Sequence, residues 1–301
     1  MSKIDWDEIR FDGKRAFLGD HARTETKLLY SSGKDYKKKI RGLRKAINRY
    51  QRIMYAHDRY SLLVVFQAMD AAGKDSTIRA VFSGVNPHGV RITSFKRPSD
   101  QELDHNFLWR TTVAMPQRGH IGVFNRSHYE EVLVCKVHPE IVTEHQKLPE
   151  EAVRDLDTLF QDRYETIRAF ERYAADNGTL VLKFFLNLSY DEQRARLISR
   201  IDEPEKNWKF SAADVRERGY WNQYQEAYEA AVNETSTPYA PWFVVPADDK
   251  RNMRLIVASA VLDALESMDM QYPELSDEEL QELAQQRRLL MNDGSPDSAA
   301  G

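Results

Sequence analysis

Continuous runs of apolar residues, rich in β-branched and aromatic side chains, recur along the chain and are bounded by polar or turn-forming residues. Such runs are too short for most helices, and they lack the alternation of apolar and polar residues that is typical of a strand with one solvent-exposed face. They therefore predict strands buried on both faces, as in a parallel sheet. The expected strands cover residues 61–66, 90–95, 120–124, 179–186 and 242–246.

Helical periodicity separates these runs. From Lys34 onward, apolar residues recur at steps of three and four and define one face of a long amphipathic helix: Ile40, Leu43, Ile47, Tyr50 and Met54. Further helices are expected at residues 78–83, 102–112, 149–177, 191–201 and 250–267. Strands that alternate with helices of this length predict βαβ units, and hence an α/β fold with a parallel sheet.

The two ends of the chain lack this pattern. Residues 1–33 mix charge, glycine and short apolar pieces, and are interpreted as an N-terminal arm. Residues 34–270 are expected to form the main domain. Within residues 271–301, Ser276 and Glu279 form a capping box for a short polar helix that reaches Leu290, and residues 292–301 are expected to be disordered.

Composition narrows the class of protein. The chain has 301 residues and a net charge of −4, which argues against a dedicated nucleic-acid-binding protein. The absence of an apolar run of about 18 residues argues against a membrane span, and the first residues do not resemble a secretory signal. The one cysteine, Cys135, excludes an internal disulfide framework. A cytoplasmic protein is the expectation.

A phosphate-binding loop is predicted directly after the first strand. Residues 67–77 read Gln-Ala-Met-Asp-Ala-Ala-Gly-Lys-Asp-Ser-Thr, in which Gly73 permits close backbone approach and Lys74 can reach terminal phosphates. The match to G-x-x-x-x-G-K-[ST] is imperfect, because Ala68 replaces the first glycine and Asp75 follows the lysine. The expected phosphate-binding residues of the loop are Ala72, Gly73, Lys74, Asp75, Ser76 and Thr77.

An acidic residue lies inside this loop. Asp70 has no obvious packing role among small residues, and could hold Mg²⁺ or orient an attacking phosphate oxygen. The alternative is that Asp70 caps the following helix.

The end of the third strand supplies a second group of polar residues. Ligands bind at the carboxyl ends of strands in open α/β sheets, so Asn125 and Arg126 should lie beside the loop. Arg126 is suited to bidentate contact with phosphate. Glu130 and Glu131 could support a metal or favour a helix N-terminus, and a structural role is favoured for His128.

Basic residues are concentrated in two segments of the chain. Arg196 and Arg200 share one face of a helix, and Lys206 and Lys209 follow on a loop broken by Pro204. Such a segment, residues 191–224, could close over transferring phosphates, although a solvated basic face is the alternative. The cations of the long helix from Lys34 raise the same two interpretations.

Taken together, these motifs resemble polyphosphate kinase family 2, within the P-loop kinases related to thymidylate kinase. The resemblance extends over residues 34–265 and rests on residues 70–77, 94–99, 104–110, 122–129, 202–211 and 239–247. It implies a three-layer α/β/α sandwich with a central parallel sheet and a helical lid. It also implies reversible Mg²⁺-dependent phosphoryl transfer between inorganic polyphosphate and adenine nucleotides, with guanine nucleotides as an open alternative. A homo-oligomer, either dimer or tetramer, is implied as well.

The resemblance also implies roles for individual residues. Asp70, with Mg²⁺, and Lys74 would be catalytic, together with Asn125, Arg126 and Glu130. Lys96, Arg97, Trp109 and Arg110 would hold the acceptor nucleotide, while Arg196, Arg200, Lys206 and Lys209 would contact polyphosphate from the lid. Many members have Asp at the position of Asn125, so the metal ligands are left open among Asp70, Glu130 and Glu131. The Asn-containing pattern resembles the subgroup that accepts both AMP and ADP.

Two other functions fit the same residues. An ATP-dependent nucleoside monophosphate kinase needs the same loop and lid. A non-catalytic module that binds polyphosphate or nucleotides would tolerate Asn125, but it would not require Asp70, Lys74 and Arg126 together.

Overall fold

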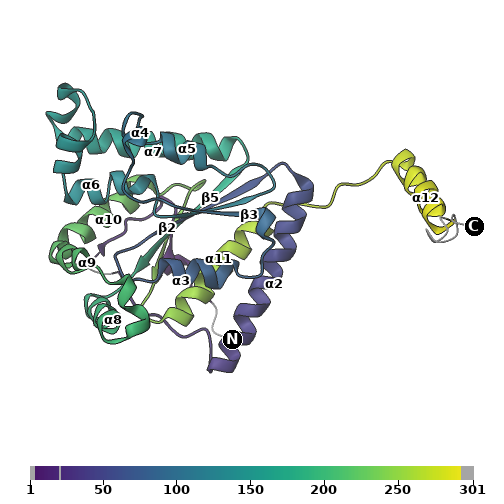
Figure 1. The fold of residues 1–301 in the computed structure, drawn as a ribbon, viewed down its shortest axis with the longest axis horizontal. Helices are drawn as coiled ribbons and strands as arrows, with labels where there is room; N and C mark the ends of the chain where they lie inside the picture. Colours follow the sequence, from purple (N-terminus) through teal and green to yellow (C-terminus); the bar gives the residue numbers. More distant parts are fainter. Residues whose placement is uncertain (1–3, 20–21, 293–301) are drawn as a thin grey trace, which may run out of the picture. The chain divides into compact units, whose positions relative to one another are not determined.

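A six-stranded, mostly parallel sheet lies at the centre of the fold (Figure 1). The computed structural model describes residues 4–19 and 22–292. The strand order is β1–β6–β5–β2–β4–β3, and β1 alone runs antiparallel to its neighbour. The strands are β1 (Arg10–Phe11), β2 (Ser61–Gln67), β3 (Val90–Ser94), β4 (Ile121–Asn125), β5 (Thr179–Asn187) and β6 (Trp242–Pro246).

Helices cover both faces of the sheet, which makes the fold a three-layer α/β/α sandwich (Figure 1). One face carries α2 (Gly33–His57), α3 (Lys74–Phe82) and α11 (Lys250–Glu266). The other face carries α5 (Trp109–Ala114), α6 (Val134–Val137), α7 (Leu156–Asp176) and α10 (Trp221–Thr235). The predicted α/β fold class is therefore confirmed.

The central strand β2 shows why the sequence forms this sheet. Leu62, Val64 and Phe66 pack toward α2, α3 and α11, whereas Leu63 and Val65 pack toward the opposite layer. Every residue of β2 is buried, so the strand needs apolar side chains on both faces of the sheet. All five strands predicted from apolar runs are present, with ends that differ by at most one residue.

The helices depart from expectation at several points. The single helix predicted over residues 102–112 is instead two short ones, α4 (Asp100–Leu103) and α5. Ser99 caps α4 with a capping box, and His105 stacks on Trp109 in the break between the two helices. The helix predicted from residue 149 starts as a 3-10 turn at Glu150–Val153, and α7 begins only after the N-cap Asp155.

Helix α10 is absent from the predictions. Its buried residues are Tyr224, Ala227, Tyr228, Ala231, Val232 and Thr235, which recur at steps of three and four. Small and polar-tipped side chains make up most of this face, so it does not stand out as an apolar stripe. The polar segment before it contains 3-10 turns at Pro204–Lys209 and Arg218–Tyr220 on either side of α9 (Ala212–Glu217).

The N-terminal arm contributes to the sheet. After the short helix α1 (Trp6–Ile9), Arg10 and Phe11 pair with Phe243 and Trp242 at the edge of β6. Ile9, Phe11 and Phe17 are buried in the core. A two-residue strand is too short to produce a periodic signal, which is why the sequence shows little pattern here.

The apolar stripe of α2 packs inside the same chain. Ile40, Ile47 and Met54 are all less than 5% exposed and contact the sheet and α11. The stripe is therefore part of the hydrophobic core of this chain. The opposite face of α2 is exposed and basic.

Residues 271–301 separate from residues 1–270 as a second unit. Within it, α12 (Asp277–Asn292) begins at the predicted capping box, where the Ser276 N–H donates to Glu279 Oε2 at 2.8 Å and the Glu279 N–H donates to Ser276 Oγ at 3.3 Å. The prediction of disorder falls mostly on residues 293–301, which lie outside the described residues. Of the helices in residues 4–19 and 22–292, each is too short or too polar to cross a bilayer.

Candidate active site

A cavity of about 570 Å³ opens at the carboxyl ends of β2 and β4, where α3, α8 (Tyr190–Asp202) and α11 converge. Its wall is strongly basic, since seven cations outnumber three carboxylates. The cations are Lys74, Arg126, Arg196, Arg200, Lys206, Lys250 and Arg254, and the carboxylates are Asp70, Asp75 and Glu192. A multiply charged anion is the ligand that such a wall attracts.

The loop between β2 and α3 forms the floor of this cavity. Ala71 and Gly73 adopt positive φ angles of 65° and 104°, and Gly73 is the N-cap of α3. A Cβ atom at Gly73 would lie 3.3 Å from Ser76 Oγ, and the left-handed backbone also favours glycine here. The loop thus directs the N-terminus of α3, with its free N–H groups, toward the cavity.

The two hydroxyl residues of the loop differ in location. Ser76 lines the cavity, and its Oγ donates to the Gly73 carbonyl at 3.0 Å. Thr77 is fully buried, with its hydroxyl facing the Met253 sulfur. Of the two predicted hydroxyls, Ser76 is therefore the one that can meet a ligand. Helix α3 begins at Lys74, four residues earlier than predicted.

Lys74 folds over its own loop. Its Nζ donates to the Ala68 carbonyl at 2.6 Å. Burial and the nearby Arg126 guanidinium lower the pKa of Lys74 to about 8, against the opposing effect of Asp70, Glu130 and Asp75. A phosphate group in the cavity would favour the charged ammonium.

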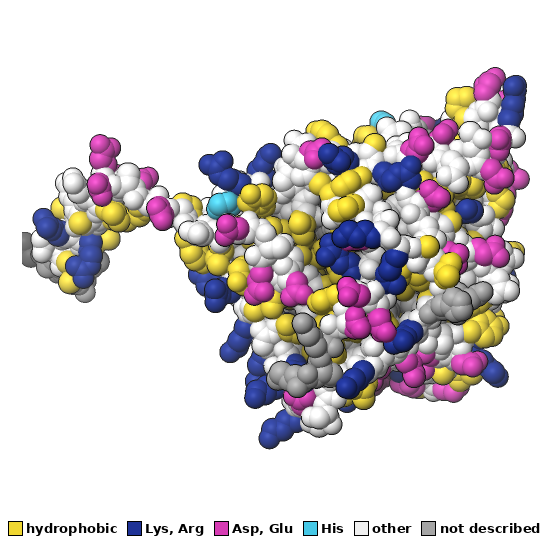
Figure 2. Space-filling model, turned by 180° about the vertical axis from the view of Figure 1, so that it is seen from behind, with side chains coloured by type: hydrophobic (Ala, Val, Ile, Leu, Met, Phe, Trp, Pro, Cys, Tyr) yellow, Lys and Arg dark blue, Asp and Glu magenta, His cyan; other side chains and the backbone are white. Residues whose placement is uncertain are grey.

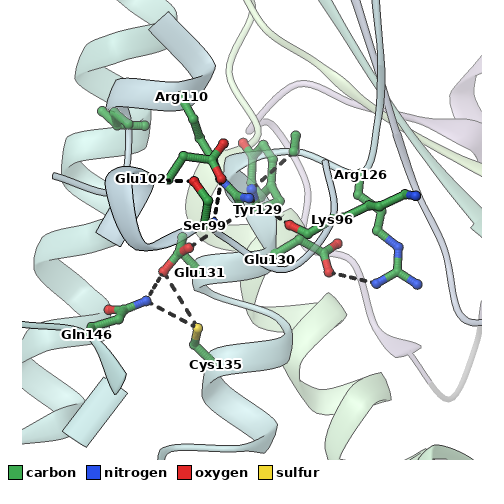
Figure 3. A network of polar contacts seen from close by, with 12 residues as sticks. Lys96, Ser99, Glu102, Arg110, Arg126, Tyr129, Glu130, Glu131, Cys135 and Gln146 are labelled. Atoms are coloured by element: carbon green, nitrogen blue, oxygen red, sulfur yellow. Dashed lines mark hydrogen bonds and ion pairs between the residues drawn. The ribbon is translucent and has the colours of Figure 1, made fainter. Parts of the chain in front are cut away.

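Arg126 joins the loop to the end of β4. Its guanidinium lies 3.2 Å from Glu130 Oε2 (Figure 3). It also lies 3.1 Å from Asp70 Oδ1, and the backbone of Arg126 has a φ angle of 63°. Attraction to Glu130 and then to Asp70 outweighs burial and raises the pKa of Arg126, so the side chain stays cationic. The predicted neighbours Asp70 and Arg126 are thus in contact.

Asp70 does not cap the helix, because the N-cap of α3 is Gly73 and this helix has no side-chain cap hydrogen bond. Its carboxylate faces the cavity beside Arg126. At the end of β4, the Asn125 amide donates to Asp75 Oδ1 at 2.5 Å. An aspartate at position 125 would place two like charges at this distance, whereas asparagine hydrogen-bonds with the carboxylate.

The described residues contain no cluster of three or more His, Cys, Asp or Glu side chains arranged to hold a metal. The carboxylates of the cavity wall still fit Mg²⁺, because this ion takes one or two carboxylates and completes its coordination with substrate phosphates and water. Asp70 is the carboxylate on the cavity wall that fits this role, with Asp75 nearby.

Glu130 and Glu131 were both candidate metal ligands, but the side chains of these two neighbours point in opposite directions (Figure 3). Glu131 is 4% exposed and accepts from Gln146 Nε2 at 2.5 Å. Arg163 Nη1 lies 3.4 Å from the same carboxylate. Glu131 is therefore a buried structural residue and is removed as a metal ligand.

His128 is also structural. It is fully buried, with Nε2 3.8 Å from Glu171 Oε1, in a polar cluster that includes Lys183. His128 and Lys183 lie within the layer packed under α7 and α10, and neither of them lines the cavity.

Arg196 holds the loop in place. All five N–H groups of its guanidinium have protein acceptors, and the side chain is 7% exposed. These contacts join α8, the phosphate loop and the end of β6, and they make Arg196 a positioning residue rather than a donor to phosphate. The acceptors are the Glu192 carboxylate and the carbonyls of Ala71, Ala72, Ala247 and Asp248.

The other predicted lid cations have carboxylate partners. Arg200 Nη1 contacts Asp214 Oδ2 at 2.8 Å, and Lys206 Nζ contacts Glu203 Oε2 at 2.5 Å. Both cations line the cavity. The side chain of Lys209 lies outside the part of the chain that the structure describes.

Two cations of the cavity wall are absent from the predicted site residues. Lys250 and Arg254 lie on the first turns of α11, directly after β6. Burial, and then Arg196, lowers the pKa of Lys250. The buried Nε of Arg254 has no hydrogen-bond partner. The rule that ligands bind at the carboxyl ends of strands, applied to β6 as it was to β2 and β4, would have found both.

The predicted nucleotide residues form a separate group beyond β3. Lys96 and Arg97 are exposed, and Trp109 stacks on His105 with ring centroids 4.1 Å apart. Arg110 is buried, and its Nη1 donates to the Lys96 carbonyl at 2.7 Å. Arg110 therefore fixes the segment that carries Lys96 (Figure 3).

The parallel sheet, the strand–loop–helix phosphate site and the basic cavity define this chain as a protein with the P-loop kinase fold. Comparison with known proteins narrows the class. The family described as Polyphosphate kinase 2 (PPK2) matches residues 30–273, and the chain belongs to this family.

Relatives and solved structures agree with this placement. An ADP-polyphosphate phosphotransferase from Rhodopseudomonas palustris is 48% identical over 93% of this chain and 96% of that protein. An AMP/ADP-polyphosphate phosphotransferase from Meiothermus ruber is 48% identical over 77% of this chain and 82% of its own length. The crystal structure of Polyphosphate Kinase 2 from Arthrobacter aurescens TC1 superposes with a TM-score of 0.84 at 34% identity, covering 97% of this chain and 98% of that one.

Proposed function

We propose that this chain catalyses reversible, Mg²⁺-dependent phosphoryl transfer between inorganic polyphosphate and adenine nucleotides, converting ADP to ATP and AMP to ADP. The observation that carries the proposal is the basic cavity over the phosphate loop, where Asp70, Lys74 and Arg126 meet. Membership of the polyphosphate kinase 2 family supports polyphosphate as the donor. The names of the two relatives support ADP and AMP as acceptors.

The chemistry follows from the residues on the cavity wall. Polyphosphate would bind along the cationic wall, with its terminal phosphate at the N-terminus of α3 and beside Lys74. An oxygen of the acceptor phosphate attacks the terminal phosphorus in line. The bond from that phosphorus to the bridging oxygen of the next phosphate breaks, and the shortened polyphosphate leaves with the electron pair.

Arg126 and Lys74 stabilise the charge on the phosphoryl oxygens during transfer. Asp70 holds Arg126 in place and is the proposed carboxylate for Mg²⁺, which would neutralise negative charge on donor and acceptor phosphates. Asn125 keeps Asp75 oriented at the cavity edge, and Glu130 supports Arg126 from the other side. No covalent intermediate with the protein is required.

The acceptor nucleotide is proposed to bind at Lys96, Arg97 and Trp109. Lys96 and Arg97 are exposed and available to a phosphate, and the Trp109 ring offers an aromatic surface. Arg110 would contribute by holding the Lys96 segment rather than by direct contact.

Residues 34–270 are proposed as the kinase domain and residues 191–224 as its lid. The supporting observation is that Arg200 and Lys206 extend from this segment into the cavity and pair with carboxylates of the same segment, Asp214 and Glu203. Phosphate would replace those partners on closure. Assembly into a dimer or tetramer remains a prediction from the family resemblance.

One assay tests the proposal and its main alternative together. Purified protein is supplied with ADP, long-chain polyphosphate and Mg²⁺ and no other nucleotide, and the products are separated by chromatography. ATP formation is expected, with AMP, GMP and GDP tested in parallel to define the acceptor. An ATP-dependent monophosphate kinase would instead convert ATP plus AMP to ADP and make no ATP from polyphosphate.

A further inference from the structure

The exposed face of α2 carries a row of cations that the cavity does not include. Figure 2 shows Lys and Arg side chains gathered along the edge of the molecule over this helix. We call these residues the α2 basic stripe. It consists of Lys34, Lys37, Lys38, Arg41, Lys45, Arg49 and Arg52, all of which are exposed.

Helical geometry places these seven residues on one face of α2. At 3.6 residues per turn they fall within a sector of about 120°, opposite the buried face that contains Ile40, Ile47 and Met54. From Lys34 to Arg52 the stripe extends along about 27 Å of helix. A positive charge therefore recurs at every turn along a straight path.

The stripe lacks internal neutralisation. Among residues 4–19 and 22–292, no carboxylate lies within ion-pair distance of any of the seven side chains. The acid of this helix, Asp35, pairs instead with Lys39 at 3.0 Å. Like charges spaced three and four residues apart repel one another, so this arrangement opposes helix stability. A linear polyanion is the partner whose charge matches it along its length.

The stripe begins close to the cavity. A Cβ atom at Gly33 would lie 3.6 Å from Arg251 Nη1. Arg251 follows Lys250 on the first turn of α11, and Lys250 and Arg254 line the cavity wall. At the flank of α2, Arg44 Nε donates to the Ala80 carbonyl of α3 at 2.5 Å. The start of the stripe thus lies beside Arg251, the sequence neighbour of the cavity residue Lys250.

We propose that the α2 basic stripe is a second binding site for polyphosphate, which holds the part of a long chain that extends beyond the cavity. The inference rests on the proposed function, because it takes the donor to be polyphosphate. It goes further by predicting that apparent affinity depends on donor chain length. A chain confined to the cavity gains nothing from α2, whereas a longer chain also releases counterions from the stripe.

The test compares two proteins with equal net charge. The stripe variant carries Lys38→Gln, Arg41→Gln, Lys45→Gln and Arg52→Gln, and the control carries Lys14→Gln, Arg154→Gln, Arg287→Gln and Arg288→Gln at exposed positions elsewhere. Glutamine is close to Lys and Arg in helix propensity, so folding should be preserved. The KM for long-chain and for short-chain polyphosphate is measured with ADP as acceptor, over a series of salt concentrations.

The stripe variant should show a KM for long-chain polyphosphate raised about 16-fold, from four surface ion contacts worth about twofold each. The KM for short chains, the KM for ADP and kcat should match the control, and the salt dependence with long chains should weaken. An unchanged long-chain KM overturns the proposal, and so does an equal rise for short and long chains.

Two further readouts separate the alternatives. Loss of single-stranded DNA binding in the stripe variant, with an unchanged long-chain KM, would assign the stripe to nucleic acid and overturn the proposal. Direct binding of long-chain polyphosphate is measured without nucleotide. If no protein forms ATP but the stripe variant alone binds polyphosphate more weakly, the proposed function fails while the second site stands.

Discussion

Arg196 offers a sharp test of how the structure assigns roles at this site. Its sequence position suggests a lid cation that contacts phosphate. In the structure, however, all five of its N–H groups donate hydrogen bonds to protein acceptors. Arg196→Lys separates the two roles, because it keeps the positive charge but loses the planar fork of donors.

The magnitude follows from the contacts. A lysine ammonium has three donors against the five of the guanidinium and cannot reach every acceptor, so about two to three hydrogen bonds are lost. At about 1 kcal/mol net for each bond, the free energy of unfolding should fall by about 2–3 kcal/mol. For a unit of this size that corresponds to a melting temperature lower by about 4–12 °C.

The assay is urea unfolding of the full chain without substrate, followed by circular dichroism and tryptophan fluorescence. Arg194→Lys is the matched control, because Arg194 is exposed on the same helix. It should leave the unfolding free energy within about 0.5 kcal/mol of the parent. Turnover of Arg196→Lys should also fall, since the backbone of Ala71 and Ala72 loses its support.

An Arg196→Lys protein as stable as the control would contradict a supporting role for the Arg196 hydrogen bonds. If such a protein also had a raised KM for polyphosphate, Arg196 would be a phosphate ligand in solution. Its contacts with the loop would then be dispensable.

Lys74, Asp70 and the Lys183–Glu171 pair give three further expected outcomes. Lys74→Ala and Asp70→Asn should each lower turnover by about 100-fold or more with unchanged circular dichroism, and near-normal ATP formation by either would contradict the assigned site. Because the pKa of Lys74 is lowered to about 8, its ammonium is lost as pH rises through that value, so kcat/KM for polyphosphate should decline above about pH 8; a flat profile to pH 10 would exclude a required Lys74 charge. Lys183→Met should lower the free energy of unfolding by about 3–5 kcal/mol, because it leaves the buried Glu171 carboxylate without the ammonium now 2.6 Å away, and Lys183→Met with Glu171→Leu should recover most of it in urea unfolding.

Much of the fold could be predicted from local patterns. The buried strands carry continuous apolar runs, and α2 carries a helical stripe, because each element must present its apolar side chains to a core at its own period. The loop with Gly73 and Lys74 was also visible, since phosphate binding depends on residues that are adjacent in the chain. Elements with weak local signals, such as β1 and α10, were missed.

The roles of individual charged residues were decided by tertiary structure. Neighbouring Glu130 and Glu131 look alike in sequence, yet one pairs with Arg126 and the other is buried against Arg163. Arg196 and Arg200 share a helix face, yet only Arg196 is enclosed by backbone carbonyls from the phosphate loop and the end of β6.

The sequence by itself thus determined the layered α/β architecture, the phosphate loop and the family resemblance. Tertiary structure alone decided which cations face the cavity and which serve as internal supports. The physical reason is that periodicity reports burial along one element, whereas a hydrogen-bond or ion-pair partner far away in the chain is fixed only when the elements pack.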